Sequence, residues 1–231
     1  AGAGFDNLDL EACTAHGVVA MNTPGQNSNA VAELAIAMMI FMSRNQFTPT
    51  TGSEIQGKTI GIQAFGNVGR LVGAKASALG MKVMAIDPFL TPEQINAGGA
   101  EPVDSLESLY SGSDFVSIHI PATPQTIKSI GYDLVSKMPK GATLINTARK
   151  EVIDEQGLLK ALEERTDLKY ATDVAPDNLD EMKEKCGLRV FATPKKMGAQ
   201  TAEANINAGL AAARQIVAFF KDGCTRFQLN K

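Results

Sequence analysis

The sequence predicts an α/β fold built on a doubly wound parallel sheet, and three observations lead to this prediction. Short apolar, β-rich runs alternate with helical patterns from Thr59 onward, which is typical of repeated βαβ units. A glycine-rich turn joins the first of these runs to the helical pattern that follows it. The chain of 231 residues is also long enough for one large domain or one and a half, at about 150 residues per domain.

Six strands are expected along the chain. In order, they are Thr59–Phe65, Val83–Asp87, Phe115–Ile120, Thr143–Thr147, Tyr170–Val174 and Val190–Thr193. Helical patterns connect them at about Asn67–Leu79, Ser105–Tyr110, Asp154–Glu164 and Leu179–Lys185. Because parallel neighbours need a crossover connection, this alternation favours a parallel sheet over a set of hairpins.

Two long helices are expected to flank this block. The first follows the cap-rich segment 27–29 and continues to about Asn45, and its apolar run at residues 30–42 is too short to span a bilayer. We interpret this run as a buried helix rich in methionine. The second helix runs from about Thr201 to Lys221 and ends before Gly223, a residue type that often terminates helices.

The charge balance and the cysteines exclude several classes of partner. The chain carries 22 basic and 25 acidic side chains, a formal net charge of -3. Without a basic surplus, neither nucleic acid nor a membrane surface is expected as a partner. The three cysteines, Cys13, Cys186 and Cys224, lie far apart and show no metal-ligand spacing. We therefore expect no metal site and a reducing, cytoplasmic location.

The glycine-rich turn is the strongest local signal of a binding site. Residues 59–70 read as a strand that enters a turn and opens a helix, where Gly66 would let the backbone approach a pyrophosphate. Gly69 would allow close packing of that helix on the strand. Ala64 occupies the position of the usual first glycine, and its methyl group is tolerable if its φ is negative. A purely structural turn is the alternative.

An acidic residue after the second strand identifies the ligand expected at this turn. Asp87 ends the run 83–87, about 20 residues past the glycines. A carboxylate there accepts hydrogen bonds from a ribose diol and repels a 2'-phosphate. The pair of signals therefore predicts NAD as the cofactor, in preference to NADP.

Arg149 is the candidate for binding an anionic substrate. It closes the segment Asn146-Thr147-Ala148-Arg149 after the fourth strand, and ligands of such sheets bind at the carboxyl ends of the strands. A guanidinium group there could hold a carboxylate with two parallel hydrogen bonds. The alternative is a surface ion pair.

Taken together, these motifs resemble those of the D-2-hydroxyacid dehydrogenases. The segments that carry the resemblance recur in the same order: Gly61 to Gly69, Ile86-Asp87-Pro88, Asn146 to Arg149, Val152-Ile153-Asp154-Glu155, Asp173-Val174 and Thr193-Pro194. The opening segment 1–9 and Met21-Asn22-Thr23-Pro24 are most similar to the phosphoglycerate dehydrogenase branch of this family.

The resemblance implies two domains. Residues 23–200 would form a Rossmann NAD-binding domain, and residues 1–22 and 201–231 would form part of a flavodoxin-like substrate domain built from both chain ends. In such enzymes roughly 70 further residues, the first part of the substrate domain, precede the position of Ala1 and include a substrate-binding arginine.

Site residues follow from the resemblance position by position. It assigns NAD contacts to Gly66, Asn67, Val68, Gly69, Asp87, Pro88, His119, Ile120, Pro121, Thr126, Thr147, Ala148, Asp173 and Gly198. It assigns substrate contacts to Gly2, Ala3, Gly4, Asn27 and Arg149. An alternative for His119 is a packed histidine, and no catalytic role is expected for it.

The catalytic pair of the family is absent. The family uses a histidine after the last strand and a glutamate shortly after Asp173, whereas this chain has Thr193-Pro194-Lys195-Lys196-Met197-Gly198 and, at the glutamate position, Asn178. A lysine has an ordinary pKa of about 10.4, so a working lysine needs a lowered pKa that a nearby carboxylate would oppose. The joint loss therefore favours a catalytic lysine, with Arg149 and partial burial lowering its pKa.

Two lysines compete for this role. Counting from Pro194 selects Lys195, which we favour, and counting back from Gly198 selects Lys196. In the preferred case Lys196 is a phosphate contact or a solvated charge. The catalytic residues expected from the sequence are thus Arg149 together with Lys195 or Lys196.

The resemblance implies an NAD-dependent oxidoreductase acting on a small anionic 2-hydroxy acid. The expected reaction is oxidation of D-3-phosphoglycerate to 3-phosphohydroxypyruvate, the first step of serine biosynthesis. A homodimer is expected, formed through the NAD-binding domain and the long helix after Asn29. The alternatives are a reductase of another 2-oxo acid, of the glyoxylate or hydroxypyruvate type, and a non-catalytic NAD(H)-sensing protein.

Overall fold

The computed structural model describes residues 2–5 and 7–231. Ala1 and Asp6 belong to the opening segment that carries part of the resemblance, and they lie outside the described residues. The chain divides into two compact units, one made of residues 1–31 with 199–231 and the other of residues 32–198.

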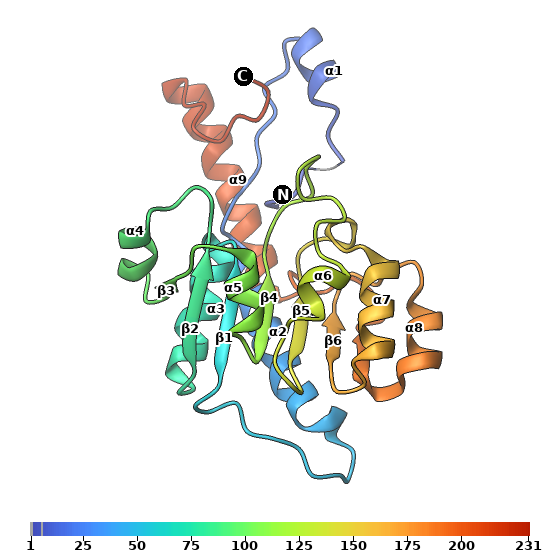
Figure 1. The fold of residues 1–231 in the computed structure, drawn as a ribbon. Coiled ribbons are helices and arrows are strands. Elements are labelled where there is room, and N and C mark those ends of the chain that lie inside the picture. The colour runs from blue at the N-terminus through green and yellow to red at the C-terminus, as the bar shows by residue number, and fades with distance from the viewer. Residues whose placement is uncertain (1, 6) are drawn as a thin grey trace. The chain divides into compact units, whose positions relative to one another are not determined.

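The larger unit is built on a parallel sheet of seven strands in the order β3-β2-β1-β4-β5-β6-β7, counted over the described residues (Figure 1). The strands are β1 (Thr59–Gln63), β2 (Lys82–Ile86), β3 (Glu101–Pro102), β4 (Phe115–Ile118), β5 (Thr143–Asn146), β6 (Lys169–Thr172) and β7 (Val190–Ala192). The chain moves outward from β1 to one edge and then from β4 to the other, so the predicted doubly wound α/β fold is confirmed. The prediction of six strands is wrong by one, because it missed the short edge strand β3.

One helix precedes β1, and the others connect the strands. They are α2 (Ser28–Ser43), α3 (Asn67–Ala78), α4 (Pro92–Ala97), α5 (Leu106–Ser111), α6 (Tyr132–Val135), α7 (Glu155–Glu164) and α8 (Leu179–Cys186), with short 3-10 turns η1 (Asn45–Phe47), η2 (Lys150–Val152) and η3 (Gly187–Arg189). The sequence analysis did not predict α4 and α6. The predicted methionine-rich helix is α2, in which Met38, Met39 and Met42 are buried.

Both faces of the sheet are buried, which explains why its strands read as continuous apolar runs. Successive residues of a strand face opposite sides, so Leu144 joins one core cluster and Ile145 the other. Tyr170 and Ala171 divide between the same two clusters. The carboxyl ends of the strands are therefore where the sheet can present polar groups to a ligand.

The smaller unit joins the two ends of the chain. Its helices are α1 (Leu10–Ala15) and α9 (Ala202–Asp222), of which α1 was not predicted. Met21 and Gln228 form an antiparallel bridge, and the amide of Leu229 donates to the carbonyl oxygen of Ala20 at 2.9 Å. The C-terminal segment thus pairs with the strand-like segment that precedes residue 23.

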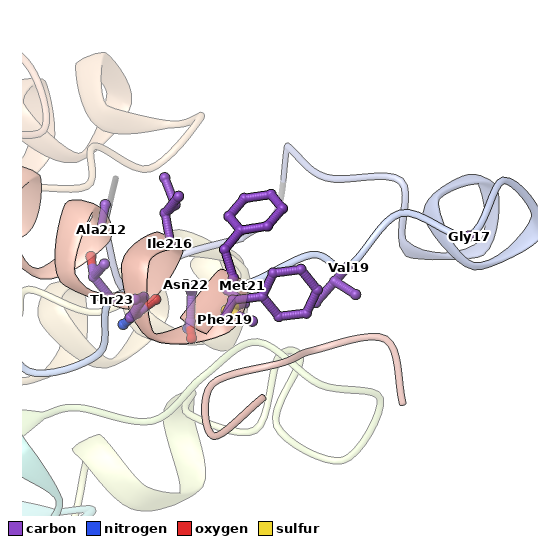
Figure 2. Close-up of a pocket in the computed structure, with 10 residues that line it drawn as sticks. Gly17, Val19, Met21, Asn22, Thr23, Ala212, Ile216 and Phe219 are labelled. Carbon is purple, nitrogen blue, oxygen red and sulfur yellow. The ribbon is translucent and has the colours of Figure 1, made fainter. Parts of the chain in front are cut away.

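An apolar cavity of about 390 Å³ lies within this smaller unit (Figure 2). Ile216 and Phe219 of α9 line it together with Val19 and Met21 of the extended segment. Phe220, at the same end of α9, is 81% exposed. Within the described chain, no helix is long and apolar enough to cross a membrane.

Candidate active site

The predicted cofactor residues of the larger unit follow the carboxyl ends of neighbouring strands. Segments after β1, β2, β4, β5, β6 and β7 contribute, and these strands pair in parallel, so their carboxyl ends meet at one edge of the sheet. The residues that follow these ends are Gly66–Gly69, Asp87 and Pro88, His119–Pro121, Thr147–Arg149, Asp173, and Lys195–Gly198.

The glycine turn opens α3 with two glycines that have different surroundings. Gly66 is the N-cap of α3 and supplies no side-chain cap, and a Cβ added to it would meet no atom within 4 Å. A Cβ on Gly69 would lie 2.3 Å from the carbonyl oxygen of Ala64 and 3.0 Å from Cγ2 of Ile62. The predicted close packing at Gly69 is therefore confirmed, while open space surrounds Gly66.

Ala64 departs from the sequence expectation. Its φ is 74°, in the left-handed region, whereas the sequence analysis required a negative φ for alanine at this position. The chain must reverse direction between β1 and α3, and the amide of Ala64 still pairs with the carbonyl oxygen of Ile86 at 2.9 Å. The turn thus keeps its geometry at a cost of about 1–2 kcal/mol for a non-glycine residue.

Asp87 is held in a fixed orientation after β2. Its Oδ2 accepts a hydrogen bond from the amide of Phe65 at 2.8 Å, and its Oδ1 accepts one from the amide of Phe89 at 2.9 Å. A carboxylate has about four acceptor sites, so both oxygens keep capacity for a further donor. The arrangement suits the two hydroxyl groups of a ribose diol.

The segment after β4 presents a neutral histidine. Burial lowers the pKa of His119 to about 4, and its Nε2 lies 3.0 Å from Oγ of Ser117. Farther along, Oγ1 of Thr126 donates to the carbonyl oxygen of Pro121 at 2.6 Å and accepts from the amide of Thr123 at 2.8 Å. These contacts agree with a packed histidine beside an ordered loop.

The turn after β5 is organised by Asn146, which the sequence analysis did not single out for a role. Its side chain is fully buried, accepts from the amide of Ala148 at 2.9 Å and donates to the carbonyl oxygen of Arg149 at 2.9 Å. The guanidinium group of Arg149 donates to the carbonyl oxygen of Ala148 at 2.9 Å. Oγ1 of Thr147 is buried without a partner among the described residues.

Asp173 links the end of β6 to the segment after β7. Its side chain is 1% exposed, and its Oδ2 accepts from the amides of Gly198 at 2.7 Å and Met197 at 3.3 Å. Its Oδ1 is buried and has no partner among the described residues. A buried carboxylate oxygen without a donor is costly, which indicates a ligand group at this position.

The lysine segment lies on the same side of the sheet, but it is not buried. Lys195 and Lys196 are both exposed, so the partial burial expected for the catalytic lysine is wrong for this structure. The reason is that Asp173 holds this segment only through backbone amides at Met197 and Gly198.

Asn178, at the position of the family's glutamate, is the N-cap of α8. Its Nδ2 donates to the carbonyl oxygen of Glu155 at 3.4 Å, and its Oδ1 is buried without a partner among the described residues. The carboxylate of Glu155 accepts from the amides of Asp177 and Asn178. The position thus carries a neutral amide that is tied to the start of α7.

The remaining predicted substrate residues lie in the smaller unit. They are Gly2, Ala3, Gly4 and Asn27. The carbonyl oxygen of Ala3 accepts from Nδ2 of Asn22 at 2.7 Å, and that of Gly2 accepts from the amide of Thr23 at 2.8 Å. These bonds order the opening loop, and its role in substrate binding stays a prediction.

Three features of the larger unit fit a dinucleotide. The space around Gly66 and the uncapped first turn of α3 suit a pyrophosphate. The fixed carboxylate of Asp87 suits a ribose. The unpartnered oxygens of Thr147 and Asp173 suit the polar groups of a nicotinamide. Over the described part of the chain, no group of three or more His, Cys, Asp or Glu side chains is placed to hold a metal ion.

A comparison with known protein families identifies the class. The model of the NAD binding domain of D-isomer specific 2-hydroxyacid dehydrogenases matches residues 30–194. The chain therefore belongs to the D-isomer specific 2-hydroxyacid dehydrogenase family and contains its NAD-binding domain. Members of this family act on small hydroxy acids.

Comparisons with individual proteins show which enzymes of this family the chain is similar to. The chain is 48% identical to the NAD+-bound 3-phosphoglycerate dehydrogenase of Entamoeba histolytica, with a TM-score of 0.92, covering 100% of this chain and 74% of that one. It is 30% identical to a glyoxylate reductase from Paecilomyes thermophila, with a TM-score of 0.84, covering 99% of this chain and 73% of that one. It is 36% identical over 230 residues to the D-3-phosphoglycerate dehydrogenase of Synechocystis sp., covering 94% of this chain.

The chain is shorter than its curated relatives. It spans 41% of the Synechocystis protein and 44% of the D-3-phosphoglycerate dehydrogenase of Methanocaldococcus jannaschii.

Proposed function

We propose that this protein oxidises D-3-phosphoglycerate to 3-phosphohydroxypyruvate with NAD, which is the entry reaction of serine biosynthesis. The observation that carries the proposal is the arrangement at the carboxyl edge of the sheet. Arg149 follows β5 and the lysine segment follows β7, beside the residues that fit NAD. The 48% identity to the Entamoeba histolytica enzyme over the whole chain supports the choice of substrate.

Each residue at the carboxyl edge of the sheet has its own role in the proposed reaction. NAD supplies the acceptor for the hydride that leaves C2 of the substrate. Arg149 binds the substrate carboxylate with its guanidinium group and stabilises the negative charge that develops on the C2 oxygen. Lys195 takes the proton of the C2 hydroxyl group, so that the C–O bond becomes a carbonyl as hydride and proton depart. The fixed backbone around Asn146 orients Arg149 for this task.

The two lysines have separate tasks in this proposal. Lys195 is the acid/base, and Lys196 provides a positive charge for the substrate phosphate. Loss of the Lys195 amine removes proton transfer, which typically contributes about 10²–10⁴-fold to the rate. Loss of the Lys196 amine weakens binding of a phosphorylated substrate and leaves proton transfer in place.

NADH formation by the full-length protein tests the proposal. D-3-phosphoglycerate should give turnover, with kcat lowered at least about 100-fold in Lys195→Ala. Lys196→Ala should raise KM for D-3-phosphoglycerate and leave the activity on D-glycerate unchanged, which makes D-glycerate the internal control. Wild-type turnover that matches both variants would refute the lysine mechanism.

The similarity to a glyoxylate reductase supports one second candidate, a reductase of another 2-oxo acid. Rates of NADH oxidation with glyoxylate and hydroxypyruvate, compared with the rate for 3-phosphohydroxypyruvate, distinguish the two functions. A site that binds the substrate phosphate should reduce 3-phosphohydroxypyruvate faster than either unphosphorylated acid. NADH binding without turnover of any of these acids would instead favour a non-catalytic NAD(H)-sensing protein.

We also propose that the smaller unit is part of a substrate-binding domain, as the sequence predicts for residues 1–22 and 201–231. The apolar cavity beside Ile216 and Phe219 supports this, since it is the kind of surface that a further layer of the same domain would cover (Figure 2). Limited proteolysis of the protein tests whether this surface is covered: α9 should stay uncut, and rapid cleavage within α9 would contradict the proposal.

A homodimer formed through the NAD-binding domain is the proposed assembly. Phe47 and Leu188 of the larger unit are 68% and 57% exposed, which supports an apolar contact surface there. Light scattering after size exclusion measures the assembly, and Phe47→Glu should shift a dimer to monomer. We also propose a cytoplasmic location, which the wide spacing of the three cysteines supports.

A further inference from the structure

The two carboxylate oxygens of Asp173 have opposite surroundings. Oδ2 accepts from the amide of Gly198 at 2.7 Å and from that of Met197 at 3.3 Å. Oδ1 is also buried, in a residue that is 1% exposed, but it accepts no hydrogen bond within the described structure. One oxygen therefore holds the segment after β7, and the other lacks the donor that a buried carboxylate oxygen requires.

The backbone of Asp173 is fixed to the sheet, so its carboxylate has a defined place. The amide of Asp173 donates to the carbonyl oxygen of Asn146 at 3.3 Å, and Oγ1 of Thr172 donates to the same oxygen at 2.8 Å. Met197 and Gly198, by contrast, lie between β7 and α9 and belong to neither. The bonds to Oδ2 thus connect a fixed carboxylate to a segment without regular structure, directly after the two lysines.

We propose that Asp173 is a positioning residue that couples binding of the nicotinamide of NAD to the order of the lysine segment, residues 195–198. The carboxamide NH2 group of nicotinamide is a hydrogen-bond donor, which suits the unpartnered Oδ1, while Oδ2 holds the segment. The coupling acts through the backbone and favours neither lysine. This inference rests on the proposed dehydrogenase function, because the segment carries the proposed acid/base.

The physical basis of the coupling is the cost of the unpartnered oxygen. While the segment is bound to Oδ2, Oδ1 is buried and has exchanged its bonds to water for none. When the segment detaches, water reaches both oxygens, but the amides of Met197 and Gly198 lose their acceptor. A ligand that donates to the buried Oδ1 therefore binds the attached state better than the detached state. Such a difference in affinity is what shifts an equilibrium between two states.

A cofactor analogue tests the coupling in the wild-type protein. In 3-acetylpyridine adenine dinucleotide, a methyl group replaces the carboxamide NH2 group of NAD, and the carbonyl and the rest of the dinucleotide are kept. Amide hydrogen exchange at Met197 and Gly198 should slow at least about fivefold when NAD saturates the protein. The analogue at saturation should leave this exchange within about twofold of that in the free protein. NAD should also bind at least about fivefold more tightly than the analogue.

Asp173→Asn tests the role of the two oxygens, because an amide keeps the shape of the carboxylate but has a single oxygen acceptor. That oxygen cannot hold the segment and accept from the carboxamide as two separate oxygens do. The variant should therefore no longer bind NAD more tightly than the analogue, and NAD should no longer slow exchange at Gly198 more than the analogue does.

Asp114→Asn is a matched control. Oδ2 of Asp114 also accepts from a backbone amide, that of Thr59 at 2.9 Å, but this bond lies at the amino edge of the sheet, where β1 and β4 begin. The control removes a carboxylate of the same kind far from the lysine segment. It should keep the wild-type ratio of the two affinities and the wild-type response of exchange to NAD.

Slower exchange with NAD but not with the analogue supports the coupling. Equal protection by the two ligands, or protection by neither, would overturn it, as would a wild-type preference for NAD in Asp173→Asn. If Asp173→Asn does not fold, the two ligands compared on the wild-type protein still decide the question. If the wild-type protein oxidises none of the hydroxy acids, the proposed function fails, whereas exchange and the two affinities still report on Asp173.

Discussion

Replacing Gly69 with alanine tests whether the close approach of α3 to β1 builds the cofactor site. The added Cβ would lie 2.3 Å from the carbonyl oxygen of Ala64 and 3.0 Å from Cγ2 of Ile62. Since comfortable contacts between heavy atoms begin at about 3.5 Å, α3 must move away from β1 by about 1 Å. The nearest atom belongs to the backbone and cannot rotate aside as the end of a side chain can.

The magnitude follows from two opposing effects. Overpacking costs about 1–3 kcal/mol, and the backbone contact at Gly69 places this case near the upper end. Alanine recovers about 1 kcal/mol through its higher helix propensity. We expect a net loss of about 1–2 kcal/mol in the free energy of unfolding, which lowers Tm by roughly 2–8 °C for a chain of this size. Displacement of the first turn of α3 should also weaken NADH binding about tenfold or more.

Gly66→Ala is the matched control, because a Cβ there meets no atom within 4 Å. Its stability should stay within about 1 kcal/mol of wild type, since only the N-cap residue changes. Its NADH affinity should fall, because the methyl group enters the space through which the pyrophosphate approaches. Thermal unfolding and NADH fluorescence titration measure both variants. A Gly69→Ala protein with wild-type Tm and wild-type NADH affinity would refute the reasoning.

Four further predictions concern charge and backbone conformation. Since burial lowers the pKa of His119 from 6.5 to about 4, only the unfolded chain binds this proton between those pH values. The free energy of unfolding should therefore fall by up to about 3 kcal/mol as pH drops through this window, and urea titrations should show a flatter dependence in His119→Asn. Asp87→Ser should weaken NADH binding and reduce the ratio of NADH affinity to NADPH affinity, because the variant lacks the carboxylate that repels a 2'-phosphate. Fluorescence titration with each cofactor measures both affinities. Ala64→Gly should raise the free energy of unfolding by up to about 1 kcal/mol, since glycine relieves the left-handed φ of 74°. Gly209→Ala should raise it by about 1 kcal/mol, because the added Cβ in α9 meets no atom within 4 Å, and a lower Tm in either variant would contradict this.

The sheet was predictable because its strands are buried on both faces and alternate with helices. The strand that escaped prediction, β3, has two residues, one of them Pro102, and lies at the edge of the sheet. No periodic pattern exists over so short a segment. Helix α4 was within reach, because Thr91, Pro92 and Gln94 form a capping box with proline at the first turn, and the structure contains both of its hydrogen bonds.

The ends of the predicted strands were placed too far along the chain, for a reason connected to the site. The run predicted as 115–120 leaves the sheet after Ile118, and the run predicted as 143–147 leaves it after Asn146. Beyond these points the amide of His119 still donates to the carbonyl oxygen of Gln63 at 2.9 Å, but neither His119 nor Thr147 belongs to a strand of the sheet. They turn out of the sheet and thereby become available to a ligand.

The sequence could locate the lysine segment but not its burial. Spacing from Pro194 and Gly198 places the lysines after β7, where the structure has them. Exposure of Lys195, however, depends on which other segments pack over it, and no local pattern reports that. The hydrogen bonds from the amides of Met197 and Gly198 to Asp173 are likewise contacts between segments, and the unpartnered Oδ1 of Asp173 became visible only once the partners of Oδ2 were known.

Ala64 shows how a motif can keep its geometry when one of its residue types changes. The usual first glycine is explained by a positive φ, and this chain has that φ with an alanine. The bond from the amide of Ala64 to Ile86 holds one side of the turn, and the close packing of Gly69 on the Ala64 carbonyl holds the other. Neighbouring contacts therefore impose the conformation, and the cost of about 1–2 kcal/mol falls on folding. Because the space around Gly66 stays open, the substitution lowers stability without closing the site.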